Sequence, residues 1–241
     1  MARTHTLNSH LSVLQTSASR FASSPAFYVP RTVSESGDVA SWEPVPYSQF
    51  LLDVELFARH WAHVLTLDGI PQRSVIGMWS VTLYLIHRST SNNSCRYRLT
   101  GMSYIDLLHI YGLSRAGYIP QLFSIRLPSP DVVFELLSKA NARALVVDPS
   151  FESLLRRCPV PTHRAATSMY DIDSHEAPLP SLPTLGEDDT VFIFHTSGST
   201  SGTPKLVPCS SLWVDSAVTK ARQIAKPSGR TERDQDVTVW M

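Results

Sequence analysis

A short stretch of hydroxyl-bearing residues and glycines that ends in a lysine is the part of this sequence best suited to chemistry. Residues 196–205 read TSGSTSGTPK, and the β-branched and aromatic run Val191–Phe194 precedes them. Glycine lets main-chain amides turn toward an anion, hydroxyls donate hydrogen bonds to its oxygens, and lysine adds a compact positive charge. We therefore expect this segment to hold the phosphates of a nucleotide. The predicted phosphate-binding residues are Thr196, Ser197, Gly198, Ser199, Thr200, Ser201, Gly202, Thr203 and Lys205.

Other loops of similar composition differ from this segment. A Walker A loop has Gly-Lys-Ser/Thr running into a helix, whereas Pro204 precedes the lysine here and the predicted short strand Leu206–Pro208 follows it. The nucleophile elbow G-x-S-x-G would make the protein a serine-type hydrolase, but Thr200 occupies its central position. A polar turn without a ligand is a further alternative. We favour a mobile hairpin loop that opens for a nucleotide and closes over its phosphates.

The segment resembles the phosphate-loop signature of the adenylate-forming (AMP-binding) superfamily, which includes acyl-CoA synthetases, adenylation domains of nonribosomal peptide synthetases and luciferases. Thr196–Thr200, Gly202 and Pro204–Lys205 match that signature. His195 stands where tyrosine is common, and Ser201 is one extra residue before the second glycine. This longer form is most similar to fungal synthetase-like carboxylic acid reductases of the aminoadipate and aryl-acid type.

The resemblance implies an enzyme that uses ATP to activate a small-molecule carboxylic acid as an acyl-adenylate, with release of pyrophosphate. It makes Lys205 a catalytic residue that stabilises charge on the departing pyrophosphate, and the donors from Thr196 to Thr203 would share that role with Mg²⁺. The acyl group would then pass to a thiol, either that of CoA or that of phosphopantetheine on a carrier domain.

Strands and helices alternate along the chain, which predicts an α/β fold with a mostly parallel sheet flanked by helices. This pattern resembles the first part of the large N-terminal subdomain of an adenylate-forming enzyme. Ligands bind at the carboxyl ends of parallel strands, so we expect residues 196–205 at that edge of the sheet. The apolar residues of the last predicted helix are expected to face mostly inward; they are Trp213, Val214, Ala217, Val218, Ala221 and Ile224. Helices are predicted over residues 11–21, 47–67, 104–116, from the N-cap Ser129 onward, and 211–225, and strands over 26–29, 75–79, 121–124, 144–147, 191–194 and 236–241.

Two places depart from an intact domain of this kind. Residues 80–98 interrupt the connection between the strand 75–79 and the helix 104–116, and such long connections are uncommon inside α/β units. We interpret them as an insertion foreign to the family, either a retained intron or a surface insertion. Their removal joins Trp79 to Leu99, and the joined sequence resembles the continuation found in the superfamily. The sequence also stops as a strand begins, so residues 1–241 are expected to form a partial AMP-binding domain with a C-terminal truncation. An inactive or merely nucleotide-binding fragment is therefore the alternative to an active enzyme.

Charge and composition argue against several other classes. The 241 residues include 21 Lys and Arg and 21 Asp and Glu, which leaves no net charge to attract nucleic acid or an anionic membrane. The longest apolar stretch, residues 75–86, is too short to span a bilayer. Three cysteines without metal or redox spacing favour reduced thiols and a cytoplasmic location, and His60 and His63 lack the partners of a metal site. Residues 1–34 have the composition of a transit peptide, but their helix-then-strand pattern favours a folded segment.

Overall fold

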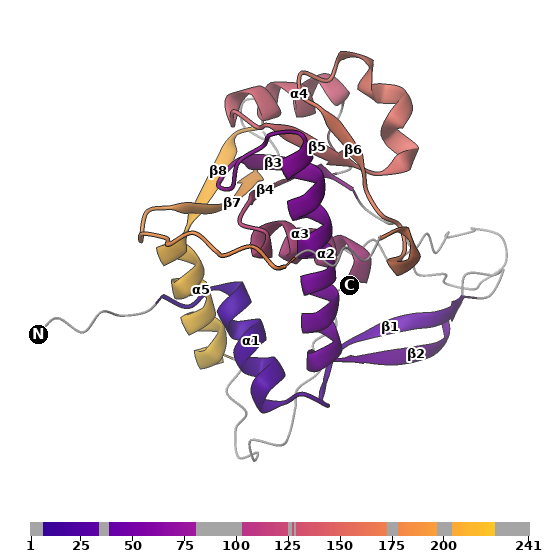
Figure 1. The fold of residues 1–241 in the computed structure, drawn as a ribbon, viewed down its shortest axis with the longest axis vertical. Helices are drawn as coiled ribbons and strands as arrows, with labels where there is room; N and C mark the ends of the chain where they lie inside the picture. The colour runs from indigo at the N-terminus through magenta and orange to yellow at the C-terminus, as the bar shows by residue number, and fades with distance from the viewer. Residues whose placement is uncertain are drawn as a thin grey trace, which may run out of the picture.

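A six-stranded sheet forms the centre of the molecule, with the strand order β6-β5-β3-β4-β7-β8 (Figure 1). The computed structural model of the protein describes residues 7–33, 39–80, 103–124, 127, 129–172, 178–196 and 204–224. All neighbouring strands of this sheet are parallel except β8, which is antiparallel to β7. The described strands are β1 (Pro25–Val33), β2 (Val39–Pro46), β3 (Val75–Trp79), β4 (Ile119–Leu122), β5 (Ala144–Val147), β6 (Thr162–Arg164), β7 (Thr190–His195) and β8 (Leu206–Ser210).

Helices cover both faces of this sheet, whereas β1 and β2 form a separate antiparallel hairpin (Figure 1). The helices α2 and α3 pack on one face and α4 on the other. The start of α1 lies beside α5, because Asn8 donates two hydrogen bonds to Asp215 Oδ1. The described helices are α1 (His10–Arg20), α2 (Tyr47–Leu67), α3 (Tyr104–Arg115), α4 (Pro130–Lys139) and α5 (Ser211–Ile224), with the 3₁₀ helices η1 (Pro149–Arg157) and η2 (Met169–Asp171).

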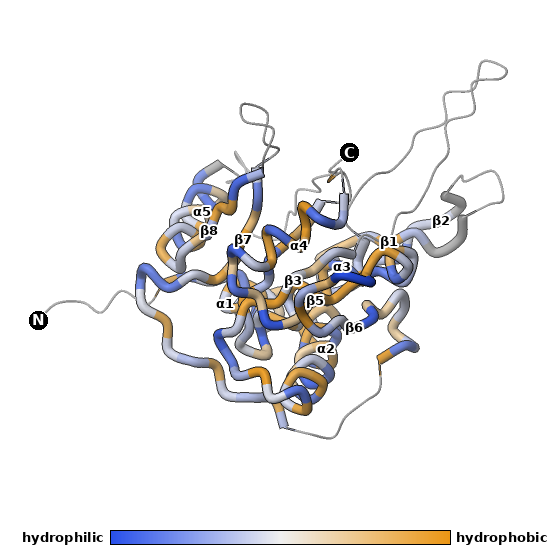
Figure 2. Tube along the Cα trace, turned by 90° about the horizontal axis from the view of Figure 1, so that it is seen from above, coloured by the Kyte–Doolittle hydropathy of each residue, from blue (hydrophilic) through white to orange (hydrophobic). Residues whose placement is uncertain are grey.

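Side chains of the central strands alternate between two apolar layers, as parallel strands covered on both faces require. On β5, Ala144 and Val146 pack against α2 and α3, whereas Leu145 and Val147 pack against α4. Figure 2 shows hydrophobic residues gathered at β3 and β5, in the middle of the molecule. A Cβ added at Gly77 of β3 would lie 2.5 Å from Leu137 Cδ2, so glycine lets α4 approach the sheet closely.

The contact between α2 and α3 combines close backbone packing with buried polar groups. A Cβ on Gly112 of α3 would lie 2.6 Å from the Cβ of Phe57 on α2. Beside this contact, Trp61 Nε1 donates to His109 Nδ1 at 3.1 Å, and His109 Nε2 lies 3.0 Å from the carbonyl oxygen of Ala166. Because Nδ1 accepts the hydrogen bond of Trp61, the proton of the neutral ring lies on Nε2, which donates to the carbonyl oxygen of Ala166. His109 is fully buried, and this burial lowers its pKa from 6.5 to about 4.

Most predicted elements within the described residues are confirmed, with two informative differences, whereas the predicted strand 236–241 lies outside the described residues and stays a prediction. The predicted strand 121–124 is shifted, because β4 runs from Ile119 to Leu122 and so includes Pro120. The proline is tolerated because β7 pairs with β4 at Gln121 and does not need the missing N–H. The inward orientation predicted for the apolar residues of α5 is wrong for Trp213, which is 54% exposed, and for Ala217 and Ala221, which are also exposed. Among the described elements, α5 contacts mainly β8, so its outer side has no layer to pack against.

The first residue of the predicted insertion, Ser80, and a residue beyond its end, Ser103, meet at one buried carboxylate. Ser80 Oγ donates to Asp106 Oδ1 at 3.0 Å, and the hydroxyl and main-chain N–H of Ser103 donate to Asp106 Oδ2 at 2.8 and 3.0 Å. Asp106 is 1% exposed and forms the capping box of α3 with Ser103. The chain therefore returns after residue 102 to the point that it left after residue 80. Apart from Ser80, the predicted insertion lies outside the described residues, and its interpretation stays a prediction.

The buried His109 predicts a loss of stability in acid. An unfolded histidine binds a proton near pH 6.5 but the folded one only near pH 4, so the stability that neutral His109 contributes is full above pH 6.5 and falls as the pH drops toward 4. His109→Gln keeps a donor and an acceptor but does not titrate. Its free energy of unfolding should fall less over this range than that of the wild type, by on the order of 2 kcal/mol. Urea unfolding at pH 7, 5.5 and 4.5 measures this, and parallel curves for the two proteins would contradict it.

Deletion of residues 80–98 tests the insertion. Because Ser80 and Ser103 bind the same carboxylate in the intact chain, residue 103 lies close to the end of β3, and the deleted chain should fold with an unchanged or higher unfolding midpoint. Each halving of the length of the connection saves roughly 0.6 kcal/mol of loop-closure entropy, and the deletion halves this length more than once. The saving therefore offsets the lost hydrogen bond of Ser80, which is worth about 1 kcal/mol. Thermal unfolding followed by circular dichroism measures the midpoint. A deleted chain that no longer unfolds cooperatively would show that the segment belongs to the fold.

Candidate functional site

The hairpin of β7 and β8 carries the predicted phosphate-binding segment. β7 ends at His195 and β8 begins at Leu206, so residues 196–205 connect them. β7 lies parallel to β4, with Gln121 opposite Ile193. The segment therefore starts at the carboxyl edge of the parallel part of the sheet, the edge where ligands bind in α/β folds. This position confirms the placement expected from the sequence.

Thr196 and Lys205 pair with each other and close the base of the segment; we call this pair the loop mouth. The main-chain N–H of Thr196 donates to the carbonyl oxygen of Lys205 at 2.9 Å. In return, the main-chain N–H of Lys205 donates to Oγ1 of Thr196 at 3.1 Å. Oγ1 is thus used as an acceptor, which leaves its proton to donate elsewhere. The side chain of Lys205 is exposed, and no described carboxylate forms an ion pair with it.

The ring of His195 joins the loop mouth to the neighbouring strand. The main-chain N–H of Ser124, just beyond β4, donates to His195 Nε2 at 3.0 Å. His195 Nδ1 lies 3.1 Å from the carbonyl oxygen of Thr196, and the ring of Phe123 stacks on the imidazole with 6.2 Å between ring centroids. The sequence marked His195 only as a departure from tyrosine and did not assign it a role. Nothing in the sequence near Ser124 signalled this contact.

Two of the predicted site residues, Thr196 and Lys205, are brought together by the structure. The others, Ser197, Gly198, Ser199, Thr200, Ser201, Gly202 and Thr203, lie outside the described residues. Their role in phosphate binding stays a prediction.

Two other residues that could do chemistry, Cys209 and His60, lie in environments that favour a structural role. Burial raises the pKa of the Cys209 thiol, so it is a weak nucleophile at neutral pH. The His60 ring packs edge-on against Trp61 with 4.9 Å between ring centroids. In the part of the chain that the structure describes, no group of three or more His, Cys, Asp or Glu side chains could hold a metal ion. Within the same residues, no helix is both long and apolar enough to cross a membrane.

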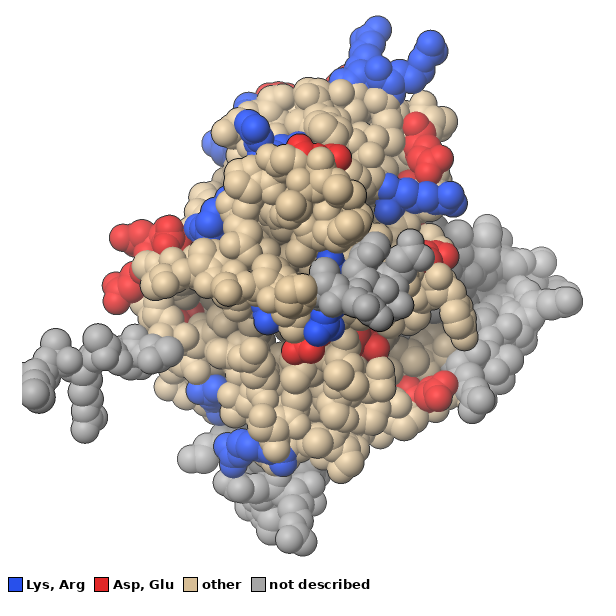
Figure 3. All heavy atoms as spheres, in the orientation of Figure 1, with Lys and Arg blue, Asp and Glu red and all other residues tan. Residues whose placement is uncertain are grey.

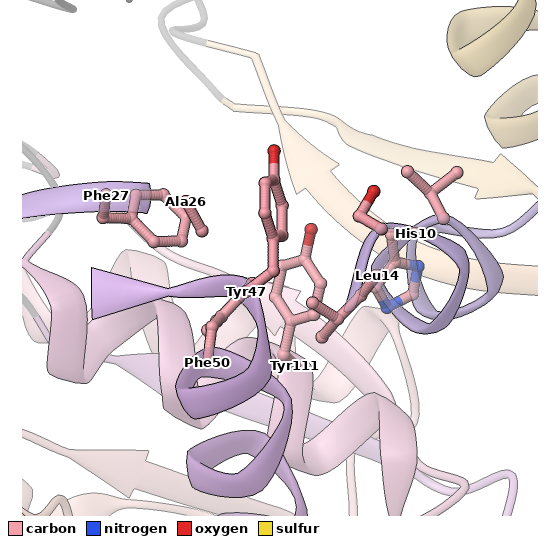
Figure 4. Close-up of a pocket in the computed structure, with 9 residues that line it drawn as sticks. His10, Leu14, Ala26, Phe27, Tyr47, Phe50 and Tyr111 are labelled. Carbon is pink, nitrogen blue, oxygen red and sulfur yellow. The ribbon is translucent and has the colours of Figure 1, made fainter. Parts of the chain in front are cut away.

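A cavity of about 210 Å³ lies apart from the loop mouth, between α1, α2, α3 and β1. Figure 4 shows the rings of Tyr47 and Tyr111 between Phe27 on one side and His10 on the other. Burial lowers the pKa of His10 to about 4, so the ring is neutral at pH 7 and the cavity offers no cation to a phosphate. None of the residues predicted to bind phosphate lines it. The lining residues are His10, Val13, Leu14, Ser17, Ala26, Phe27, Tyr47, Phe50 and Tyr111.

Charges are mixed on the face of the molecule that is seen in Figure 3. On the face drawn in Figure 3, Lys and Arg side chains are interspersed with Asp and Glu. A surface of this kind does not concentrate a field of one sign, so an anionic ligand must be selected by local groups such as the loop mouth.

The loop mouth predicts a specific effect of removing the Thr196 hydroxyl. Thr196→Val keeps the shape of the side chain but removes the acceptor of the Lys205 N–H, so the Lys205 amide should exchange with solvent two- to tenfold faster, as expected for one hydrogen bond. Thr196→Ser retains the acceptor and serves as the matched control. Amide hydrogen exchange followed by NMR measures this. Equal protection of Lys205 in both variants would show that Oγ1 does not hold the loop mouth.

Comparison with known proteins gives one curated relative and many solved structures of the same fold, while no family model matches the chain. The relative is iboA, an AMP-binding domain-containing enzyme of Amanita muscaria, which is 31% identical over 214 residues, or 86% of this chain and 37% of iboA. The N-terminal subdomain of NpsA from Klebsiella oxytoca has a TM-score of 0.59 and 16% identity, over 85% of this chain and 42% of that subdomain. The nonribosomal peptide synthetase FmoA3 in its AMPPNP-bound form has a TM-score of 0.58 and 17% identity, over 90% of this chain and 19% of FmoA3.

The chain thus spans about two fifths of the length of iboA and of the NpsA subdomain. The solved structures confirm the predicted α/β fold with its mostly parallel sheet. The description of iboA as an AMP-binding domain-containing enzyme agrees with the nucleotide-binding role predicted for residues 196–205. The sequence similarity to iboA and the shared fold therefore agree with the resemblance to the adenylate-forming (AMP-binding) superfamily.

Proposed function

We propose that residues 196–205 bind the phosphates of ATP, as part of an enzyme that activates a carboxylic acid as an acyl-adenylate. The observation that carries this proposal is the loop mouth. Its pairing sets an exposed lysine and a threonine hydroxyl at the two ends of a Ser/Thr/Gly segment, at the carboxyl edge of a parallel sheet. AMPPNP-bound FmoA3 and the NpsA complex with 3-hydroxybenzoyl-AMSN support a nucleotide at this fold.

The chemistry proposed for Lys205 follows from where charge grows. In the reaction, the carboxylate oxygen attacks the α-phosphorus of ATP, the bond to the bridging oxygen breaks, and pyrophosphate departs with the additional negative charge. An ammonium group held at the departing phosphates stabilises the transition state more than the ground state. Loss of one such preorganised donor typically raises the barrier by about 2.7 to 4 kcal/mol.

The hydroxyl of Thr196 is proposed to donate a hydrogen bond to a phosphate oxygen. Its Oγ1 already accepts the N–H of Lys205, which orients the hydroxyl while leaving the proton available. Ser197–Thr203 are proposed to continue this row of donors. Together they would replace the water around the triphosphate with fixed dipoles.

The cofactor and partners are proposed on the same basis. Magnesium would arrive on the phosphate oxygens of ATP, since this ion is commonly held by substrate phosphates with few protein ligands, and it would share the phosphate charge. The acyl acceptor is proposed to be the thiol of CoA or of phosphopantetheine. A carrier domain is favoured by the solved NpsA-ThdA protein, an artificially fused adenylation-PCP di-domain. The likeness of the longer loop to fungal carboxylic acid reductases is a narrower proposal within this class.

A second candidate function is nucleotide binding without turnover. It requires only the groups of the loop mouth that could hold a phosphate. The hydrolase alternative loses support, because a nucleophile elbow joins a strand to a helix, whereas β7 is followed by the antiparallel strand β8.

Lys205→Ala tests the proposal through binding, which both candidate functions share. The 241-residue chain should bind ATP, and the substitution should weaken this binding at least tenfold because the ammonium charge on the phosphates is lost. Isothermal titration calorimetry with Mg-ATP and with pyrophosphate measures both affinities. Lys220→Ala, which removes an exposed lysine of α5, is the matched control. The role assigned to Lys205 is refuted if the two variants bind equally well.

A further inference from the structure

We infer that His195 is a positioning residue that fastens the loop mouth to the end of β4, and that it does so as the neutral Nδ1–H tautomer. This inference deepens the proposed function and rests on it for its effect on nucleotide binding. The geometry itself involves only described residues: His195 on β7, Ser124 and Phe123 beyond β4, and Thr196 in the loop mouth.

The hydrogen-bond partners leave only one arrangement of the ring proton. The main-chain N–H of Ser124 can only donate, so His195 Nε2, 3.0 Å away, must present a lone pair. The carbonyl oxygen of Thr196 can only accept, so Nδ1, 3.1 Å away, must carry the proton. Nδ1 thus donates to Thr196, which follows β7, while Nε2 accepts from Ser124, which follows β4. The environment of the ring selects the tautomer.

The bond to Ser124 acts where the sheet ladder between β4 and β7 has ended. The register of these two strands pairs Gln121 with Ile193, two residues before His195. Beyond that pair, the His195 ring takes over the link between the carboxyl ends of β4 and β7, and Phe123 stacks on it. The hairpin is thereby tied to the parallel sheet at the edge where the loop starts.

Thr196 is consequently held through three of its polar atoms. Lys205 bonds its main-chain N–H and its Oγ1, and His195 bonds its carbonyl oxygen. Loss of the His195 ring would free the carbonyl and release the start of the loop from β4, while the pairing of Thr196 with Lys205 could persist. The threonine hydroxyl and the lysine would then have to be ordered when a phosphate binds, which lowers affinity.

The tautomer is tested directly by NMR on the 241-residue chain. In a long-range ¹H–¹⁵N correlation spectrum of labelled protein at pH 8, the assigned His195 ring should show a protonated Nδ1 and an unprotonated Nε2. His63, which is exposed on α2, provides the comparison within the same spectrum. A protonated Nε2 on His195 would overturn the inference, because that nitrogen could not accept from Ser124.

Variants test the consequence for binding. His195→Phe keeps a ring but removes both hydrogen bonds; it should speed exchange of the Ser124 amide and weaken Mg-ATP binding about fivefold, without a large shift in the unfolding midpoint. His195→Gln can place an amide oxygen near the Ser124 N–H and should restore part of both losses. His63→Gln is the matched control. Unchanged ATP affinity in His195→Phe would overturn the positioning role.

The outcomes separate this inference from the proposed function. A wild-type chain that binds no ATP refutes the proposed function and the effect of His195 on binding. The ring spectrum and the Ser124 amide exchange would still decide whether His195 joins the two strand ends.

Discussion

The placement of β7 beside β4 is the constraint on which the site depends. Two parallel strands deliver their carboxyl ends to the same edge of a sheet, and here this edge carries both Ser124 and the start of residues 196–205. Thr196 and Lys205 then close the connection to β8. If β7 slipped by one residue, every side chain on it would change face, and His195 would no longer reach Ser124. A local set of hydrogen bonds thus relies on the register of the sheet.

The centre of the same sheet is held between two apolar layers. Side chains of β3 and β5 alternate between α2 and α3 on one face and α4 on the other. Two glycines permit the close approaches, since Gly77 leaves room for Leu137 and Gly112 leaves room for Phe57. Packing as tight as this resists shifts between helices and strands. The buried polar groups of Trp61 and His109 are paired with each other, so neither of these two side chains leaves an unpaired donor between α2 and α3.

The sequence was most informative where periodicity and motif agreed. The helix 47–67 and the strands 75–79 and 144–147 were predicted with the bounds that the structure has, because long amphipathic or uniformly apolar runs leave little choice of element. The position of the loop at a strand end followed from the same alternation. β2 was missed because its polar residues and two prolines conceal a strand that pairs only with β1. The exposure of Trp213 depends on which elements surround α5, and a helical pattern cannot supply that information.

Of the candidate site, the sequence predicted the groups that could contact a phosphate but not the way they are supported. Thr196 and Lys205 were identified from their types and spacing, whereas the bond between His195 and Ser124 joins residues far apart in the chain. Such a contact arises from topology, and a single sequence carries no local signal for it. The hydrogen bond from Ser80 to Asp106 is a further contact of this kind.

The meeting of Ser80 and Ser103 at Asp106 also bears on the kinetics of folding. β3 must pair with β4, which follows α3, so the chain between residues 80 and 103 has to be closed before this pairing can be completed. Greater sequence separation between contacting residues raises the contact order and slows folding, while its cost in equilibrium stability grows only logarithmically. The length of this connection therefore affects the rate at which the nascent chain forms its parallel sheet, and the time for which unpaired strand edges are open to aggregation, more than the stability of the finished fold.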